Sequence, residues 1–129
     1  MTRYPTQTWP AVVAAFAGLA DVPALAPLAR AVEQIAVSRY AAALFPVKSM
    51  HTLLLYQHPT AGPEDERLVL AHEDGELVLR FERGQLAAPP ASLRTTVPEW
   101  ETRGLDALTL LGRAADQLRW FVEYGAPAV

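Results

Sequence analysis

The residues best suited to chemistry in this chain are its three histidines, His51, His58 and His72. An imidazole changes its charge near neutral pH and can serve as an acid, a base or a metal ligand. His51 and His72 lie at the ends of two apolar segments, and Glu73 and Glu76 follow His72 closely. Two imidazoles beside a carboxylate are typical of a divalent-metal or acid–base site. The candidate ligand or metal residues are therefore His51, His72, Glu73 and Glu76.

Whether these residues meet depends on the register between the two segments, which we expect to pair as antiparallel strands. In one register His51 faces His72, and in the other, shifted by one residue, Thr52 faces His72. A one-residue slip moves every side chain of a strand to the opposite face of the sheet. The apolar pattern fits both registers, so both stay open. We prefer the simpler interpretation, in which both histidines are polar strand ends, and His58, at the far end of its strand, joins neither arrangement.

The clearest structural signal is the dipeptide Asp74-Gly75 between two alternating segments, residues 67–73 and 76–82. A two-residue type I′ turn needs positive φ at both central residues, which Asp-Gly accommodates. This turn places the leucines of both segments on one face and sets Arg67 opposite Glu82 on the other. The sequence therefore predicts a β-hairpin.

Helical periodicity appears on both sides of this hairpin. Thr8 and Pro10 are typical of a helix start, as an N-cap and a first-turn proline. Apolar stripes at helical spacing predict helices over residues 9–20, 25–44 and 105–124, with Thr102 as a possible cap of the last. Strands are predicted within residues 50–57, at both arms of the hairpin, and at 92–97.

These elements predict an α+β fold in a single domain, residues 1–129. It consists of two N-terminal helices, an antiparallel sheet of three to four strands built on the hairpin at Asp74-Gly75, and one C-terminal helix packed on the sheet. Whether the fourth strand joins the sheet stays open.

Composition excludes several classes of function. The 11 basic residues are dispersed among 14 acidic ones, for a net charge of −3, and Lys48 is the only lysine. Nucleic-acid binding depends on clustered basic residues, so we expect no nucleic-acid partner. The absence of cysteine and of a glycine-rich phosphate loop leads us to expect no cofactor. No apolar segment reaches the roughly 18 residues that span a bilayer, and we expect a cytoplasmic protein without a membrane partner.

Aromatic residues supply the candidates for a pocket or an interface. Tyr56 ends the first predicted strand, and Trp100 lies in a charged stretch where we expect it to be partly exposed. Both side chains combine a large apolar ring with one polar group. We therefore take Tyr56 and Trp100 as pocket or interface residues.

A moderately apolar second face of the hairpin, with Val69, Ala71 and Val78, favours binding over catalysis. A sheet with water on one side is usually polar there. We therefore expect a non-catalytic binding or regulatory protein that acts through protein–protein contacts, with a second copy of the chain as the expected partner. The alternative is a small enzyme or divalent-metal-binding protein using His51 and His72 with a turn glutamate.

Overall fold

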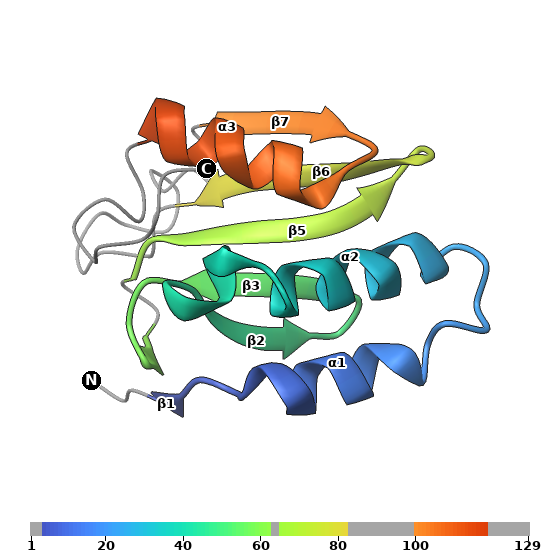
Figure 1. The fold of residues 1–129 in the computed structure, drawn as a ribbon, viewed down its shortest axis with the longest axis horizontal. Coiled ribbons are helices and arrows are strands. Elements are labelled where there is room, and N and C mark those ends of the chain that lie inside the picture. The colour runs from blue at the N-terminus through green and yellow to red at the C-terminus, as the bar shows by residue number, and fades with distance from the viewer. Residues whose placement is uncertain (1–3, 63–64, 83–99, 119–129) are drawn as a thin grey trace, which may run out of the picture.

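The chain forms a five-stranded antiparallel sheet with helices on one side (Figure 1). A computed structural model describes residues 4–62, 65–82 and 100–118. The strand order is β2-β3-β5-β6-β7, with β2 at Phe45–Ser49, β3 at Thr52–Tyr56, β5 at Arg67–Glu73, β6 at Glu76–Glu82 and β7 at Trp100–Gly104. The α+β class is confirmed, but the prediction of three to four strands was wrong, since the sheet has five.

The two strands that the sequence pattern missed are both at the edges of the sheet. β2 contains Pro46, two residues after the end of the helix predicted at 25–44; an edge strand tolerates proline because one row of its N–H groups has no ladder partner. β7 alternates charged and uncharged side chains and resembles a loop in sequence. The strand predicted at 92–97 lies outside the described residues.

The hairpin at Asp74-Gly75 is confirmed. Both turn residues have positive φ, 53° and 82°, and the ladder runs from Glu73 opposite Glu76 to Arg67 opposite Glu82. A second two-residue turn, Met50-His51, joins β2 to β3, with Met50 at φ 52°. His51 therefore belongs to a turn and not to a strand.

The register left open by the sequence is decided between β3 and β5. Leu53 lies opposite Leu70 and Leu55 opposite Leu68, which is the register that would extend to His51 opposite His72. The ladder stops at Leu53, however, because the chain has already entered the Met50-His51 turn.

Three α-helices accompany the sheet: α1 at Trp9–Ala17, α2 at Ala26–Ala36 and α3 at Ala107–Leu118. The Thr8 side chain caps α1 by accepting a hydrogen bond from the Ala11 N–H. The second helix is shorter than the predicted 25–44: it ends at Ala36, and a 3-10 helix, Arg39–Ala42, follows. Asp106, rather than Thr102, caps α3 through the Thr109 N–H.

The main core lies between the helices and one face of the sheet. α2 and α3 lie in front of the sheet in Figure 1, with α1 alongside α2 next to β2. The sheet residues that contribute to this core are Leu53, Leu55, Leu68, Leu70, Leu77, Leu79 and Phe81. None of the described helices is both long and apolar enough to cross a membrane.

The opposite side of the sheet, which we call the second face, points away from the described helices. Alternation along each strand assigns to it Phe45, Val47, Ser49, Thr52, Leu54, Tyr56, Arg67, Val69, Ala71, Glu73, Glu76, Val78, Arg80, Glu82, Glu101 and Arg103. A small ribbon of β1, Tyr4–Pro5, and β4, Thr60–Ala61, completes the described strands.

Candidate functional site

The two candidate histidines make separate contacts. His51 is exposed in the β2–β3 turn. The His72 ring, at the end of β5, places Nδ1 2.9 Å from the carbonyl oxygen of Ala24, in the segment between α1 and α2. Since a carbonyl oxygen only accepts, this nitrogen donates, and His72 ties that segment to the sheet.

The two candidate carboxylates lie opposite each other beside the hairpin turn, as their spacing predicts. Glu73 accepts two hydrogen bonds from the Arg80 guanidinium, at 2.7 and 2.6 Å. Its oxygens are therefore committed to an arginine. Within residues 4–62, 65–82 and 100–118, no three histidine or acidic side chains form a group able to hold a metal ion.

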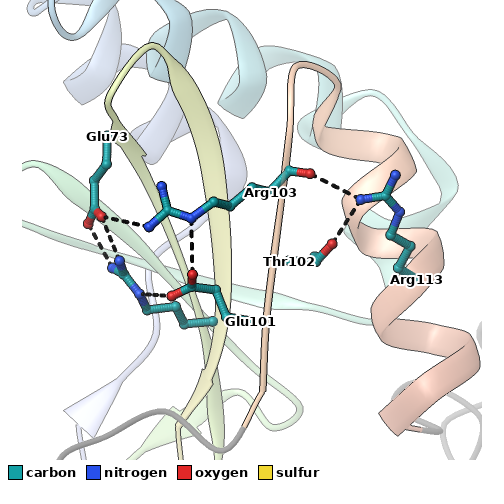
Figure 2. A network of polar contacts seen from close by, with 6 residues as sticks. Glu73, Glu101, Thr102, Arg103 and Arg113 are labelled. Carbon is teal, nitrogen blue, oxygen red and sulfur yellow. Dashed lines mark hydrogen bonds and ion pairs between the residues drawn. The ribbon is translucent and has the colours of Figure 1, made fainter.

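The most extensive polar arrangement that the structure describes is an ion-pair network on the second face (Figure 2). Arg80 on β6 bridges Glu73 on β5 and Glu101 on β7, with Nε 2.8 Å from a Glu101 oxygen. Arg103 donates to the other Glu101 oxygen at 3.0 Å and lies 3.7 Å from Glu73. We call these four residues, Glu73, Arg80, Glu101 and Arg103, the charge network.

The charge network has a clear electrostatic effect on its members. Hydrogen bonds from Arg80 lower the pKa of Glu73 and of Glu101 below the ordinary value for glutamate, and Arg103 adds to the effect at Glu101. The hydrogen bond to Glu73 raises the pKa of Arg80 above its already high ordinary value. Both carboxylates thus stay ionised at neutral pH and are poorly suited to donating or accepting protons there.

Beneath the charge network lies an apolar floor. Val78 is fully buried, although it points away from the main core, and Ala71 and Val69 are less than a tenth exposed. Arg103 is the cross-strand neighbour of Val78, and Arg80 that of Val69. Arginine stems cover apolar surface well while keeping their charge near water, so these two side chains shield the floor.

Away from the charge network, the second face contains an open pocket of about 560 Å³. Its lining residues are Tyr4, Pro5, Val47, Tyr56, Ala61, Gly62 and Arg67. Tyr56 is 6% exposed and lies at the end of β3, next to Arg67 in the sheet pattern. Tyr56, a candidate pocket residue from the sequence, is thus one of the residues that line this pocket, and its role there stays a prediction.

Trp100 lies on the other side of the sheet. Its ring is half-buried and packs against the main core, and its indole N–H donates to the Gln117 side chain of α3. In this position Trp100 joins β7 to α3. The second face and the pocket do not include it.

Sequence reasoning missed most of this site for two reasons. The charge network needs β7, and β7 was not recognised as a strand, so Glu101 and Arg103 had no place beside Arg80. The pocket needs β1 to pair with β4, more than 50 residues later, and a two-residue pairing leaves no periodic signal. The pattern did predict the pairing of Arg67 with Glu82, and the two side chains are 3.0 Å apart.

Comparison with models of protein families, with curated proteins and with solved structures found no match to this chain. The functional interpretation therefore depends on the geometry of the second face alone.

Proposed function

We propose that this protein is a non-catalytic binding module that pairs with a second copy of itself through the second face of its sheet. The observation that carries the proposal is the one-sided placement of the described helices, which cover one face only. The other face is not the polar surface expected beside water, because the apolar side chains Phe45, Val47 and Leu54 are only half-buried there.

The edges of the sheet support a contact through the face rather than through added strands. At the β2 edge, the Gln7 N–H donates to the Pro46 carbonyl at 2.9 Å and the Gln7 side chain accepts from the Lys48 N–H. At the β7 edge, Arg113 of α3 donates to the Arg103 carbonyl at 3.1 Å (Figure 2). A partner strand would have to displace these groups, which is how proteins protect edge strands.

The charges of the second face suit a self-complementary partner. Arg67, Arg80 and Arg103 are balanced by three paired glutamates, and Glu76 adds one further negative charge. Because this surface is nearly neutral, it offers no net electrostatic attraction to a strongly charged partner. A copy related by two-fold symmetry presents the same mixture of signs and can set arginine against glutamate.

The size of the face is adequate for a modest interface. Five strands spaced about 4.8 Å apart, with about 3.4 Å per residue along a seven-residue strand, give roughly 600 Å² of flat sheet. Stable interfaces bury roughly 800 Å² of accessible surface on each partner. A face-to-face packing of two sheets therefore reaches the lower part of the range for specific complexes.

The test is the mass of the protein in solution, measured by sedimentation or light scattering. The chain mass is 14.1 kDa, so the wild type is expected to run at twice that value. Leu54→Arg places a charge at the centre of the second face and is expected to shift the mass to 14.1 kDa, because an unpaired charge cannot be buried between two sheets. Circular dichroism checks that the variant stays folded.

The matched control is Val37→Arg, at an apolar residue that is 88% exposed at the end of α2. It is expected to leave the dimer intact. A wild type that sediments as a monomer at about 100 μM, or equal dissociation of both variants, would rule out the proposed dimer.

The alternative, a metal or acid–base site at His51 and His72, has less support. One histidine lies in a turn and the other donates to a backbone carbonyl, while Glu73 is held by Arg80. No observation on the described residues favours this function over binding.

A further inference from the structure

The pocket at one end of the second face has two walls of different origin. The first wall belongs to the main sheet and consists of Val47 of β2, Tyr56 of β3 and Arg67 of β5. The second wall is the β1–β4 ribbon, with Tyr4 and Pro5 on one strand and Ala61 and Gly62 at the other. The pocket exists because this ribbon is held against the sheet.

Several hydrogen bonds fix the ribbon in this position. Both the Thr6 N–H and its hydroxyl donate to the Pro59 carbonyl, at 2.9 and 3.0 Å, which ties the two strands together. The next residue, Gln7, bonds to the backbone of β2 on both sides of Val47, as described above. Asp65 closes the other end, since its carboxylate accepts from the Gly62 N–H at 2.9 Å. The pocket is thus preformed, as small-molecule sites usually are.

The chemistry of the lining defines the class of ligand. Two tyrosine rings, a proline, a valine and an alanine make the walls mostly apolar. The one charged lining residue, Arg67, contacts Glu82 through both Nε and Nη2, at 3.2 and 3.0 Å. An anion would therefore meet an arginine whose charge is already balanced, with a carboxylate beside it. A cation would meet a carboxylate whose charge is already balanced, with an arginine beside it.

We propose that this pocket binds a small, uncharged molecule with an apolar, ring-containing body. Its volume of about 560 Å³ lies within the roughly 300–1,000 Å³ of typical small-molecule sites. Aromatic rings are matched by Tyr4 and Tyr56, which can pack against them in offset or edge-to-face geometry. The pocket shares Val47, Tyr56 and Arg67 with the second face, whereas Leu54, the residue that tests the proposed dimer, does not line it, so the two proposals can be tested separately.

The experiment compares two fluorescent probes that share the same rings. N-phenylnaphthylamine is uncharged, and anilinonaphthalene sulfonate adds one negative charge to that framework. Fluorescence titration is expected to show saturable binding of one uncharged probe per chain, with a dissociation constant on the order of 10–100 μM for a ligand of this size. The charged probe is expected to bind at least about fivefold more weakly, because the lining offers it no unpaired cation within the described residues.

Substitutions then locate the binding. Val47→Phe places a larger side chain in the pocket and is expected to weaken binding of the uncharged probe roughly tenfold or more. The same type of change at Val37→Phe, on an exposed position outside the pocket, serves as the matched control and is expected to have no effect. Tyr4→Ala removes an exposed wall without touching the core and is expected to weaken binding with no loss of stability.

Four results would overturn the inference. Three come from the experiments above: the absence of saturable binding of the uncharged probe, equal weakening by Val47→Phe and Val37→Phe, and tighter binding of the charged probe. The fourth comes from the Leu54→Arg variant. Repeating the titration with Leu54→Arg separates this inference from the dimer. Binding to that variant but not to the wild type would show that a second copy fills the pocket, which also contradicts a small-molecule site. Binding to a wild type that is monomeric would uphold the pocket while removing the dimer.

Discussion

Arg80 is the residue on which the polar contacts of the second face converge. Its guanidinium reaches Glu73 on one neighbouring strand and Glu101 on the other, and its stem lies beside Val69. Arg80 is 21% exposed, and its two partners are about a third exposed. Surface ion pairs are individually weak, but a bidentate arginine in a network is the favourable case. One side chain thus joins three strands and covers apolar surface.

Replacing Arg80 by methionine keeps the stem and removes the charge. We expect Arg80→Met to lower the free energy of unfolding by roughly 1 kcal/mol at pH 7. Because Arg80 lowers the pKa of Glu73 and Glu101, their contribution is fully present above the unfolded glutamate pKa of about 4.5 and is lost as the pH falls through the lower, folded values. The difference between wild type and variant should therefore shrink towards pH 3, as measured by urea unfolding at both pH values.

Arg30→Met is the matched control, since Arg30 is exposed on α2 and lies outside the charge network. We expect it to change the free energy of unfolding by less than about 0.5 kcal/mol at either pH. If Arg80→Met cost the same at pH 3 as at pH 7, its effect would come from packing, and the electrostatic role of the network would be wrong.

At the scale of elements, the two hairpins decide where the functional residues lie. The Asp74-Gly75 turn fixes the pairing of β5 with β6 and so sets Arg80, a member of the charge network, across from Val69. The Met50-His51 turn fixes β2 against β3 and takes His51 out of the ladder. A two-residue turn leaves no freedom of register to the strands that it joins. The two turns therefore fix the pairing within each hairpin, while β7 adds Glu101 and Arg103 to the second face through its own ladder with β6.

Two glycine-to-alanine substitutions test this element-level role. Gly75 has φ 82°, and no atom lies within 4 Å of an added Cβ, so the cost of Gly75→Ala is purely conformational. We expect a loss of about 1–2 kcal/mol in the free energy of unfolding. Gly18, at the C-cap of α1, has φ −64°, where alanine is comfortable and meets only an ordinary contact at 3.5 Å.

Gly18→Ala should therefore be neutral or stabilise the protein by about 0.5 kcal/mol, because it reduces the entropy of the unfolded chain. Both values can be measured by chemical denaturation. A Gly75→Ala variant as stable as the wild type would contradict the strain that we assign to this turn.

At the scale of the whole molecule, one core connects all the larger elements. Its residues come from α1, α2, α3 and three strands of the sheet. Trp9 reports on one end of this core, where its indole N–H donates to the carbonyls of Ala41 and Leu44 at 3.1 Å. Trp100 reports on the other end, between β7 and α3. A single core is the physical basis of a cooperative unit.

We expect the chain to unfold in one transition. Tryptophan fluorescence and far-ultraviolet circular dichroism should give coincident urea curves, because helices and sheet lose the same core together. The comparison is cleanest with the Leu54→Arg variant, in which dissociation of the proposed dimer does not contribute. Two separated transitions would show that the chain does not lose this core in one cooperative step.

The features that the sequence determined by itself are those with a local cause. Asp74-Gly75 specifies a turn through the backbone conformations that the two residues tolerate, and Thr8 specifies a helix start through one side-chain hydrogen bond. The alternation in residues 67–82 assigned each side chain to a face before any partner strand was known. The α+β class followed from these signals.

What only the tertiary structure decided has a non-local cause. Pro46 belongs to a strand because Gln7 and β3 supply partners on its two sides, which no local pattern of residues 44–49 reveals. The charge network joins residues from three strands, and the pocket joins residues 4–5 to 60–62, so both depend on register and on long-range pairing. The histidines were candidates because of their type and spacing, yet His51 lies in a turn and His72 donates to a backbone carbonyl, so they do not form one site. Side chains become a site only when the backbone brings them to the same place, and here it brought together arginines, glutamates and tyrosines.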